Sequence, residues 1–186
     1  QTRFGENRVQ EAAAKMPACP GHLQGHLVGH LQSNKAAQAA QLFDWIHSVD
    51  SLKLLEALDR HAGEAGRRLE VMVQVNVSGE RSKSGLAPGE VPAVLAAGSR
   101  LPHVQIRGVM TIPPLAEDPE KSRMFFRELR ERRDGWAAQT GLDLAELSMG
   151  MTHDLEVAIE EGATFVRVGT GIFGARQKPA REEEQA

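Results

Sequence analysis

The sequence contains no tyrosine, a single cysteine, no long apolar run and no excess of one charge. Its one thiol, Cys19, cannot form an internal disulfide, so we expect a reducing, cytoplasmic location. No apolar run reaches the roughly 20 residues that span a bilayer, and no signal peptide opens the chain. Charges of both signs are interspersed at a formal net charge of −3, unlike the one-signed field of a nucleic-acid binder. We therefore expect neither a membrane nor a nucleic acid as partner.

The sequence also lacks an initiator methionine. Its first residues, from Gln1, are predicted to be the end of a strand followed by a helix. This start predicts that a segment before Gln1 is absent from the printed sequence. With 186 residues, 41% of them hydrophobic, the chain is long enough for one domain with its own core. We assign residues 1–178 to that domain, and expect residues 179–186 to form a frayed, charged tail.

Strand-like apolar runs alternate along the chain with helical segments or with turns that can start a helix. This alternation predicts an α/β fold with a parallel sheet, and the commonest closed version of that sheet has eight strands. The sequence supplies seven such units, so one unit is expected to be missing from the front. The predicted strands lie near residues 2–6, 26–31, 45–49, 70–77, 104–112, 146–149 and 164–168.

Residues with capping side chains precede three predicted helices. Asn7 stands before the first helix, and Ser33–Lys35 stand before an alanine-rich helix over residues 36–42. Asp50 and Ser51 precede a helix with leucines at helical spacing. We expect these side chains to cap the helices that follow them.

A long helix is predicted over residues 119–140. A basic cluster at residues 130–133 lies on one face, and could touch a polyanion. The interspersed Glu128 and Glu131 favour a solvated, ion-paired helix face instead. The apolar residues on or near the opposite face are Met124, Phe125, Leu129 and Trp136.

Three histidines, His22, His26 and His30, recur at intervals of four residues. On a helix this spacing would align three imidazoles, which are common metal ligands. Glycines before each histidine would each destabilise such a helix by about 1 kcal/mol. An extended segment without a metal is therefore the favoured interpretation.

The last two predicted strands end in small and hydroxyl residues. Because side chains alternate along a strand, Phe165 and Arg167 should share one face. A buried guanidinium needs an acceptor, and the glycines around Thr170 expose amides that suit an anion. We interpret the segment as a phosphate cradle beside a cation. Two plainer readings remain: Arg167 pairs with Glu6 or Asp154, or Ser148 only satisfies a backbone group.

Six blocks of the sequence, in order, resemble the signature motifs of the pyridoxal phosphate homeostasis proteins, single-domain relatives of the alanine racemase barrel. The resemblance covers nearly the whole chain. Its blocks lie at residues 4–11 (FGENRVQE), 29–35 (GHLQSNK), 75–85 (VNVSGERSKSG), 107–112 (RGVMTI), 147–156 (LSMGMTHDLE) and 166–174 (VRVGTGIFG).

This resemblance implies a (β/α)8 barrel of the alanine racemase type, here lacking its first βα unit, with pyridoxal 5′-phosphate at the mouth of the barrel. In the family a lysine at the end of the first strand holds the aldehyde as a Schiff base, and no matching run occurs here. By similarity, Ser148, Gly169 and Thr170 would bind the phosphate.

Further positions follow from the same resemblance. Arg167 would face the pyridine nitrogen, while Asn7, His30 and Met149 would line the pocket near the ring. Lys83, in the polar loop after the fourth predicted strand, could trap an aldehyde, but a solvated loop lysine is a poor nucleophile, so we assign it a structural or electrostatic role.

The resemblance implies a monomeric protein of intracellular pyridoxal phosphate homeostasis, which stores the cofactor and delivers it to apoenzymes without turnover. The rival function is an amino-acid racemase on the same barrel. Racemisation needs two bases on opposite faces of the substrate, and in the racemases the second is a tyrosine, which this sequence lacks. A histidine could replace it in principle. A third reading, an interaction scaffold, would apply if no lysine were supplied.

Overall fold

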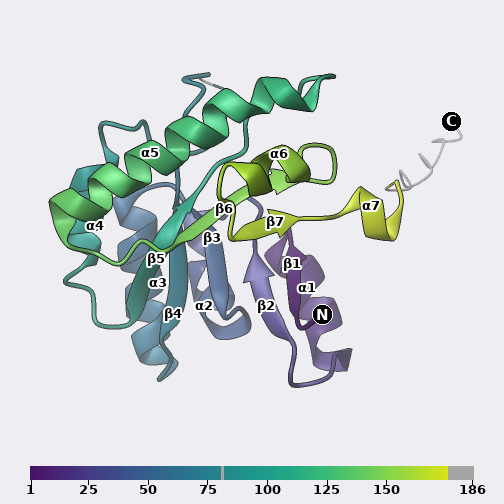
Figure 1. Cartoon of the computed structure of the whole chain (residues 1–186). Coiled ribbons are helices and arrows are strands. Elements are labelled where there is room, and N and C mark those ends of the chain that lie inside the picture. Colours follow the sequence, from purple (N-terminus) through teal and green to yellow (C-terminus); the bar gives the residue numbers. More distant parts are fainter. Residues whose placement is uncertain (81, 176–186) are drawn as a thin grey trace, which may run out of the picture.

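The structure is a computed structural model that describes residues 1–80 and 82–175. All strands in these residues are parallel and pair in chain order, each with its sequence neighbours, from β1 to β7 (Figure 1). The prediction of seven strands in an α/β fold is confirmed, whereas the predicted tail at residues 179–186 lies outside the described residues. The strands are β1 Arg3–Glu6, β2 Gln24–Leu27, β3 Trp45–Val49, β4 Leu69–Gln74, β5 Val104–Met110, β6 Glu146–Met151 and β7 Phe165–Arg167.

Helices connect the strands and cover the outside of the sheet, which curves into a nearly closed barrel (Figure 1). Among the residues that the structure describes, no helix combines the length and apolar character that crossing a bilayer requires. The helices are α1 Val9–Lys15, α2 Ala36–Leu42, α3 Leu52–Glu64, α4 Val91–Gly98, α5 Arg123–Thr140, α6 Leu155–Glu160 and α7 Thr170–Phe173, with short 3-10 turns η1 Met16–Ala18, η2 Ser33–Lys35 and η3 Pro119–Ser122.

The first and last strands approach each other through their side chains. The guanidinium carbon of Arg3, on β1, lies 5.1 Å from the centre of the Phe165 ring, on β7. The same ring lies 5.3 Å from each of the rings of Trp45 and His47, and 5.6 Å from that of His26. An aromatic cluster therefore fills this part of the barrel interior. Phe165 lies on the same face of β7 as Arg167, as the strand alternation predicted.

The outer core lies between the sheet and its helices. Amphipathic α3 buries Leu54, Leu55 and Leu58, none of which is more than 1% exposed. Each such side chain contributes about 1.5–3 kcal/mol of transfer free energy. In α5 the core-facing aromatic residues are Phe126, which is fully buried, and the predicted Trp136, which is 7% exposed, whereas the predicted Met124 is 65% exposed. Phe126 and Leu129, three residues apart, share the core-facing side of the helix. The prediction for Met124 was wrong because Met124 lies two residues before Phe126, and residues two apart do not share a helix face.

Two predicted strands end three or more residues earlier than expected. The strand predicted over residues 26–31 is β2, which begins at Gln24 and stops at Leu27. A Cβ atom at Gly29 would lie 2.2 Å from the backbone oxygen of Asn7, so the chain here turns against β1 and cannot continue the ladder. The strand predicted over residues 70–77 likewise ends at Gln74.

Of the predicted caps, one is confirmed. The Ser51 hydroxyl accepts a hydrogen bond from the Leu54 amide at 3.2 Å, at the start of α3. Asn7 is not the N-cap of α1, because Arg8 takes that place without a side-chain cap bond. Residues 33–35 form η2 instead of a cap, and Lys35 precedes α2.

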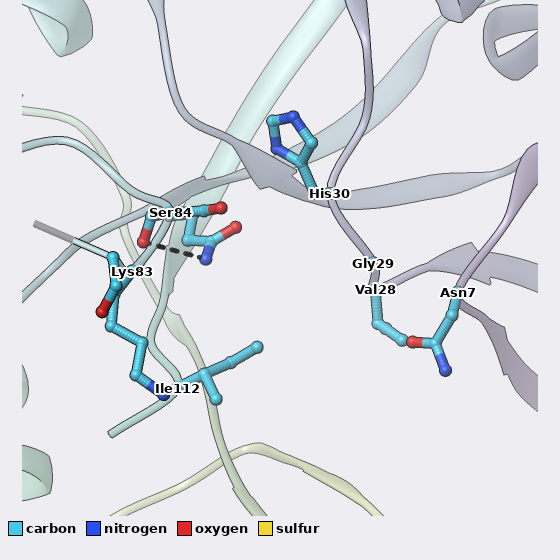
Figure 2. A pocket seen from close by; sticks show the side chains of 9 residues that line it. Asn7, Val28, Gly29, His30, Lys83, Ser84 and Ile112 are labelled. Atoms are coloured by element: carbon cyan, nitrogen blue, oxygen red, sulfur yellow. Dashed lines mark hydrogen bonds between the residues drawn. The ribbon is translucent and has the colours of Figure 1, made fainter. Parts of the chain in front are cut away.

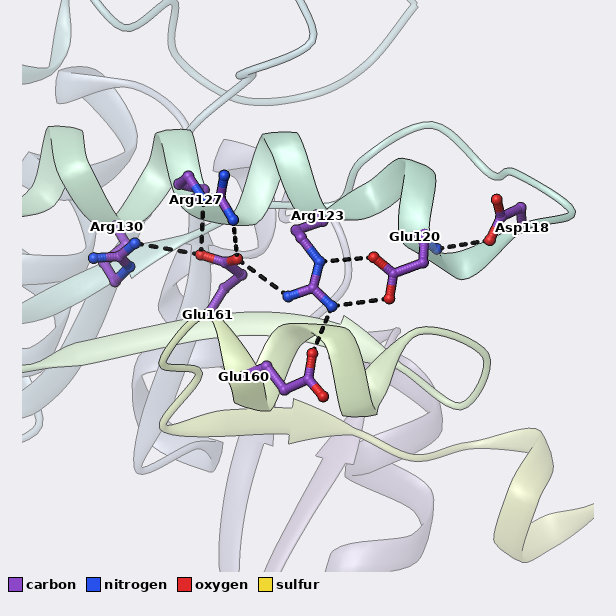
Figure 3. Close-up of polar contacts among 7 residues, drawn as sticks. All are labelled: Asp118, Glu120, Arg123, Arg127, Arg130, Glu160 and Glu161. Atoms are coloured by element: carbon purple, nitrogen blue, oxygen red, sulfur yellow. Dashed lines mark hydrogen bonds and ion pairs between the residues drawn. The ribbon is translucent and has the colours of Figure 1, made fainter.

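Arginines of α5 point toward the end of α6 and converge on Glu161 (Figure 3). Arg123, Arg127 and Arg130 all donate to its carboxylate, and that side chain is only 6% exposed. Arg132 pairs with Glu128 on the exposed helix face, as the charge pattern predicted. The basic residues of α5 are therefore largely neutralised, and Glu161 fixes α6 against α5.

Candidate functional site

A cavity of about 280 Å³ opens where parallel strands end, at the carboxyl side of the sheet. In Figure 2, Asn7 and Val28 lie on one side of this cavity, Lys83 and Ser84 lie on the opposite side, and His30 lies between them. In barrels of this kind, ligand sites are built from the loops at this end. The lining residues are Asn7, Val28, Gly29, His30, Gln74, Ser82, Lys83, Ser84 and Ile112.

Two of the predicted site residues, Asn7 and His30, thus line the same cavity. The chain brings them together because each follows the end of a strand, β1 or β2. Nδ1 of His30 lies 3.1 Å from a carboxylate oxygen of Asp50, and the His30 side chain is 55% exposed. This contact orients the imidazole while leaving much of it open to a ligand.

Arg167 lies at the end of β7, and its guanidinium points into the barrel. Its Nη1 donates to the Ser148 hydroxyl at 2.7 Å, and its Nη2 donates to the backbone oxygen of Thr111 at 2.9 Å. Thr111 directly precedes Ile112, which lines the cavity, so the guanidinium is bonded to the residue next to the cavity lining, although Arg167 is not itself a lining residue. Burial lowers the pKa of Arg167 to about 10, and Asp154 opposes this shift.

The Arg167 charge has no carboxylate partner among the described residues. Glu6, one expected partner, pairs with Lys15 at 3.0 Å. The other, Asp154, accepts a hydrogen bond from the Met151 amide at 2.7 Å. Two neutral acceptors do not neutralise the positive charge of a guanidinium, which still has N–H groups to donate. An anionic or electron-rich ligand can supply the further acceptor.

Ser148 and Met149, neighbours on β6, face opposite sides of the sheet. Ser148 is fully buried in the barrel interior, where its hydroxyl bonds to His47 as well as to Arg167. It therefore supports the arginine and bonds to no backbone group among the described residues. Because the hydroxyl is engaged by His47 and Arg167, it is not free for the predicted phosphate contact. Met149 is also fully buried, but within the apolar core cluster, so the structure does not bring it to the cavity wall.

A hydroxyl that the sequence reasoning missed lies at the predicted phosphate cradle. The Thr152 hydroxyl oxygen, just after β6, accepts hydrogen bonds from the amides of Gly169 and Gly171 at 3.2 and 3.3 Å. It keeps its own proton for donation to an anion. Thr170, exposed at the start of α7, has an amide without a partner among the described residues. The cradle thus consists of Thr152 with the backbone of residues 169–171.

The three evenly spaced histidines do not form a metal site in this arrangement. His26 is 3% exposed inside the barrel, whereas His30 lies at the cavity. Within residues 1–80 and 82–175, no group of three or more metal-binding side chains comes together.

The sequence of this chain matches a known family and several named proteins. Residues 1–177 match the family model described as alanine racemase, N-terminal domain. A protein of Pseudomonas aeruginosa named pyridoxal phosphate homeostasis protein is 45% identical over 174 residues, which are 93% of this chain and 74% of that protein. A protein of the same name from Aquifex aeolicus is 43% identical, over 94% of this chain and 77% of its own length.

Solved structures agree with these matches. PipY of Synechococcus elongatus, solved with PLP bound, superposes with a TM-score of 0.86 at 46% identity, covering 94% of this chain and 82% of PipY. The alanine racemase of Clostridium difficile, in complex with cycloserine, gives a TM-score of 0.77 at 14% identity, over 95% of this chain and 48% of the racemase. The latter similarity concerns the fold alone.

Proposed function

Because the chain belongs to the pyridoxal phosphate homeostasis proteins, within the alanine racemase N-terminal domain family, we propose that it binds pyridoxal 5′-phosphate at the barrel mouth. In this assignment Thr152, Gly169 and Thr170 hold the phosphate. Arg167 faces the pyridine nitrogen, and Asn7 and His30 flank the ring. The observation that carries the proposal is the Arg167 guanidinium, which has only neutral acceptors among the described residues and bonds to Thr111, the residue before the cavity-lining Ile112.

The residues present fit this ligand chemically. A phosphate dianion needs hydrogen-bond donors, and the Thr152 hydroxyl proton and the Thr170 amide can supply two, while the amides of Gly169 and Gly171 donate to the Thr152 oxygen. A Cβ atom at Gly169 would meet nothing within 4 Å, so the backbone there is open to a close approach. An arginine does not give up its proton, so it favours a ring nitrogen that accepts a hydrogen bond.

These residues suit storage better than turnover. When bound, the cofactor supplies a reactive aldehyde and a pyridine ring that can accept electrons. Arg167 keeps the ring nitrogen unprotonated, which makes the ring a weaker electron acceptor than one paired with a carboxylate. We infer a carrier that limits the free aldehyde and hands the cofactor to apoenzymes, acting as a monomer in the cytoplasm.

Titration with pyridoxal 5′-phosphate and with pyridoxal, which lacks the phosphate, tests this function. Pyridoxal 5′-phosphate should bind at least ten times more tightly than pyridoxal, because pyridoxal has no phosphate for the cradle to bind. Thr152→Val should remove most of that difference, while Ser99→Ala, a distant hydroxyl change, should leave it intact. Equal affinity for the two ligands would refute the assignment.

The rival function, amino-acid racemisation, needs a second base that this sequence does not provide as tyrosine. His30 is the histidine that lines the cavity, and it contacts Asp50. Incubation of the cofactor-loaded protein with L-alanine distinguishes the two functions. We expect no D-alanine above the level formed by free cofactor, and rapid formation that His30→Gln abolishes would establish the racemase instead.

A further inference from the structure

A chain of side-chain hydrogen bonds crosses the barrel interior and ends on Arg167. Nδ1 of His26 lies 2.9 Å from Nε2 of His47, and Nδ1 of His47 lies 2.9 Å from the Ser148 hydroxyl. The same hydroxyl oxygen receives Nη1 of Arg167 at 2.7 Å. The two histidines and the serine are at most 3% exposed, so water does not compete with these bonds. The chain links β2, β3, β6 and β7.

The direction in which protons are donated along this series of hydrogen bonds follows from Arg167, its charged end. Arg167 can only donate, so the Ser148 oxygen accepts. If Ser148 then donates to Nδ1 of His47, His47 donates from Nε2 to Nδ1 of His26. One buried atom, Nε2 of His26, is left without a partner among the described residues. In the opposite direction the Ser148 proton would also lack an acceptor, so the first direction satisfies more buried groups.

Both histidines must be neutral for this chain to hold. Burial, followed by the charge of Arg3, lowers the pKa of His26 to about 4. Burial also holds the pKa of His47 well below its usual range, and His26 and Arg167 add to that effect. The remaining neighbours of His47 in this cluster are the rings of Trp45 and Phe165, which carry no charge. Asp44 opposes the shift at His26 without overcoming it.

Although serine and histidine together resemble a nucleophile with its base, this pair cannot attack a substrate. The Ser148 side chain is fully buried, and its oxygen already accepts a bond from a cation. What the pair can do is hold the guanidinium. Without the serine oxygen, Arg167 keeps only the bond from Nη2 to the Thr111 carbonyl, about which the guanidinium group can turn.

We propose that His47 is a positioning residue for Arg167: by accepting the Ser148 proton, it directs the serine oxygen toward the guanidinium and aims the guanidinium at the ligand. The inference deepens the proposed function and rests on it for the identity of the ligand. The positioning itself is a property of the free protein. His47 is not among the residues that line the cavity, and the hydrogen bonds that connect it to Arg167 run through Ser148.

Two substitutions at His47 separate positioning from packing. His47→Asn retains an acceptor near the place of Nδ1, whereas His47→Leu removes it, and both lose the bond to His26. Rotation of the Arg167 guanidinium, measured by 15N NMR in the free protein, should be slow in the parent and in His47→Asn, and fast in His47→Leu. His61→Leu, at a surface histidine of α3, should match the parent.

Affinity for pyridoxine 5′-phosphate, which has no aldehyde, gives the second measurement. His47→Leu should bind about ten times more weakly than the parent, the effect of one misdirected charge-assisted hydrogen bond, and His47→Asn should restore most of the affinity. Slow guanidinium rotation in His47→Leu, or equal impairment of both variants, would overturn the inference. If the parent does not bind the probe but the rotation rates differ as expected, the proposed function fails and the positioning role stands.

Should His47→Leu fail to fold, Ser148→Ala removes the same oxygen with little change in volume. Fast guanidinium rotation in that variant would support the claim that the Ser148 oxygen holds Arg167 in place. Slow rotation in Ser148→Ala would show that Arg167 is held without the serine, and would overturn the inference.

Discussion

Replacing Glu161 with glutamine removes the charge on which three arginines of α5 converge. The Glu161 carboxylate oxygens lie 3.2 Å from Arg123, 2.9 Å from Arg127 and 3.3 Å from Arg130. Hydrogen bonds from Arg127, and then from Arg123 and Arg130, lower the pKa of Glu161 to about 2. Because Glu161 stands between α6 and β7, its loss should loosen the part of the fold that carries Thr152 and the cradle.

The size of the effect follows from exposure. The three arginine side chains are 26%, 53% and 36% exposed, so each ion pair is partly screened and contributes less than about 1 kcal/mol. Removing a carboxylate that is itself 6% exposed, and leaving its partners unmet, should lower the free energy of unfolding by about 2 kcal/mol. For a chain of this length that corresponds to roughly 4–8 °C in melting temperature.

Urea denaturation at pH 7 measures this loss, with Glu128→Gln as a matched control. Glu128 pairs only with Arg132 on the exposed face of α5, so its loss should be about 0.3–0.5 kcal/mol. Equal destabilisation by the two variants would refute the reasoning.

The pH dependence provides a second check on Glu161. A carboxylate with a lowered folded-state pKa stabilises the fold at pH values above its ordinary pKa, and this contribution disappears as the pH falls through the folded-state value. The ordinary value is 4.5 and the folded value is about 2. The stability difference between the parent and Glu161→Gln should therefore shrink between these pH values, and a constant difference would contradict the account.

Four further predictions concern the barrel and its covering helix α5. Gly108→Ala should prevent pairing of β5 with β6 and destabilise the fold by more than about 3 kcal/mol, since a Cβ atom there would lie 1.8 Å from the Glu146 oxygen. Gly135→Ala, in open space on α5, should instead stabilise by about 0.5–1 kcal/mol in the same urea assay. Phe126→Ala should cost about 3–5 kcal/mol by calorimetry, because the ring is fully buried. Since the folded pKa of His26 is about 4 and its ordinary value is 6.5, stability should fall as the pH drops between them, by up to about 1.4 kcal/mol per unit, and His26→Phe should flatten this decline in urea titrations.

The sequence predicted the strands well because their signal is local. The strand predicted over residues 45–49 matches β3 without error, and the strands predicted for β4, β5 and β6 agree within a few residues. The end of β2 could not be predicted in the same way. It depends on the contact between Gly29 and the backbone of Asn7, which lies in another strand-to-helix turn. Strand ends of this kind are set by tertiary packing and not by propensity.

The candidate site was predicted in part. The glycines near Thr170 and the charge of Arg167 stand out in the sequence, because a cation and a glycine run at a strand end are unusual together. The link from Ser148 to His47 spans 101 residues, and no local pattern announces it. Thr152 carried a weak signal that was overlooked: it follows the carboxyl end of β6, where residues of a barrel reach the mouth.

Affinity for pyridoxal 5′-phosphate in Arg167→Met tests the central claim most directly. The account predicts binding at least ten times weaker than in the parent, because a guanidinium that is hydrogen-bonded only to neutral acceptors among the described residues is lost. Arg132→Met, on the outer face of α5, should change the affinity little. Arg167→Lys should not restore the affinity, since an ammonium lacks the planar fork that reaches both Ser148 and the Thr111 carbonyl. Undiminished binding in Arg167→Met would contradict the account.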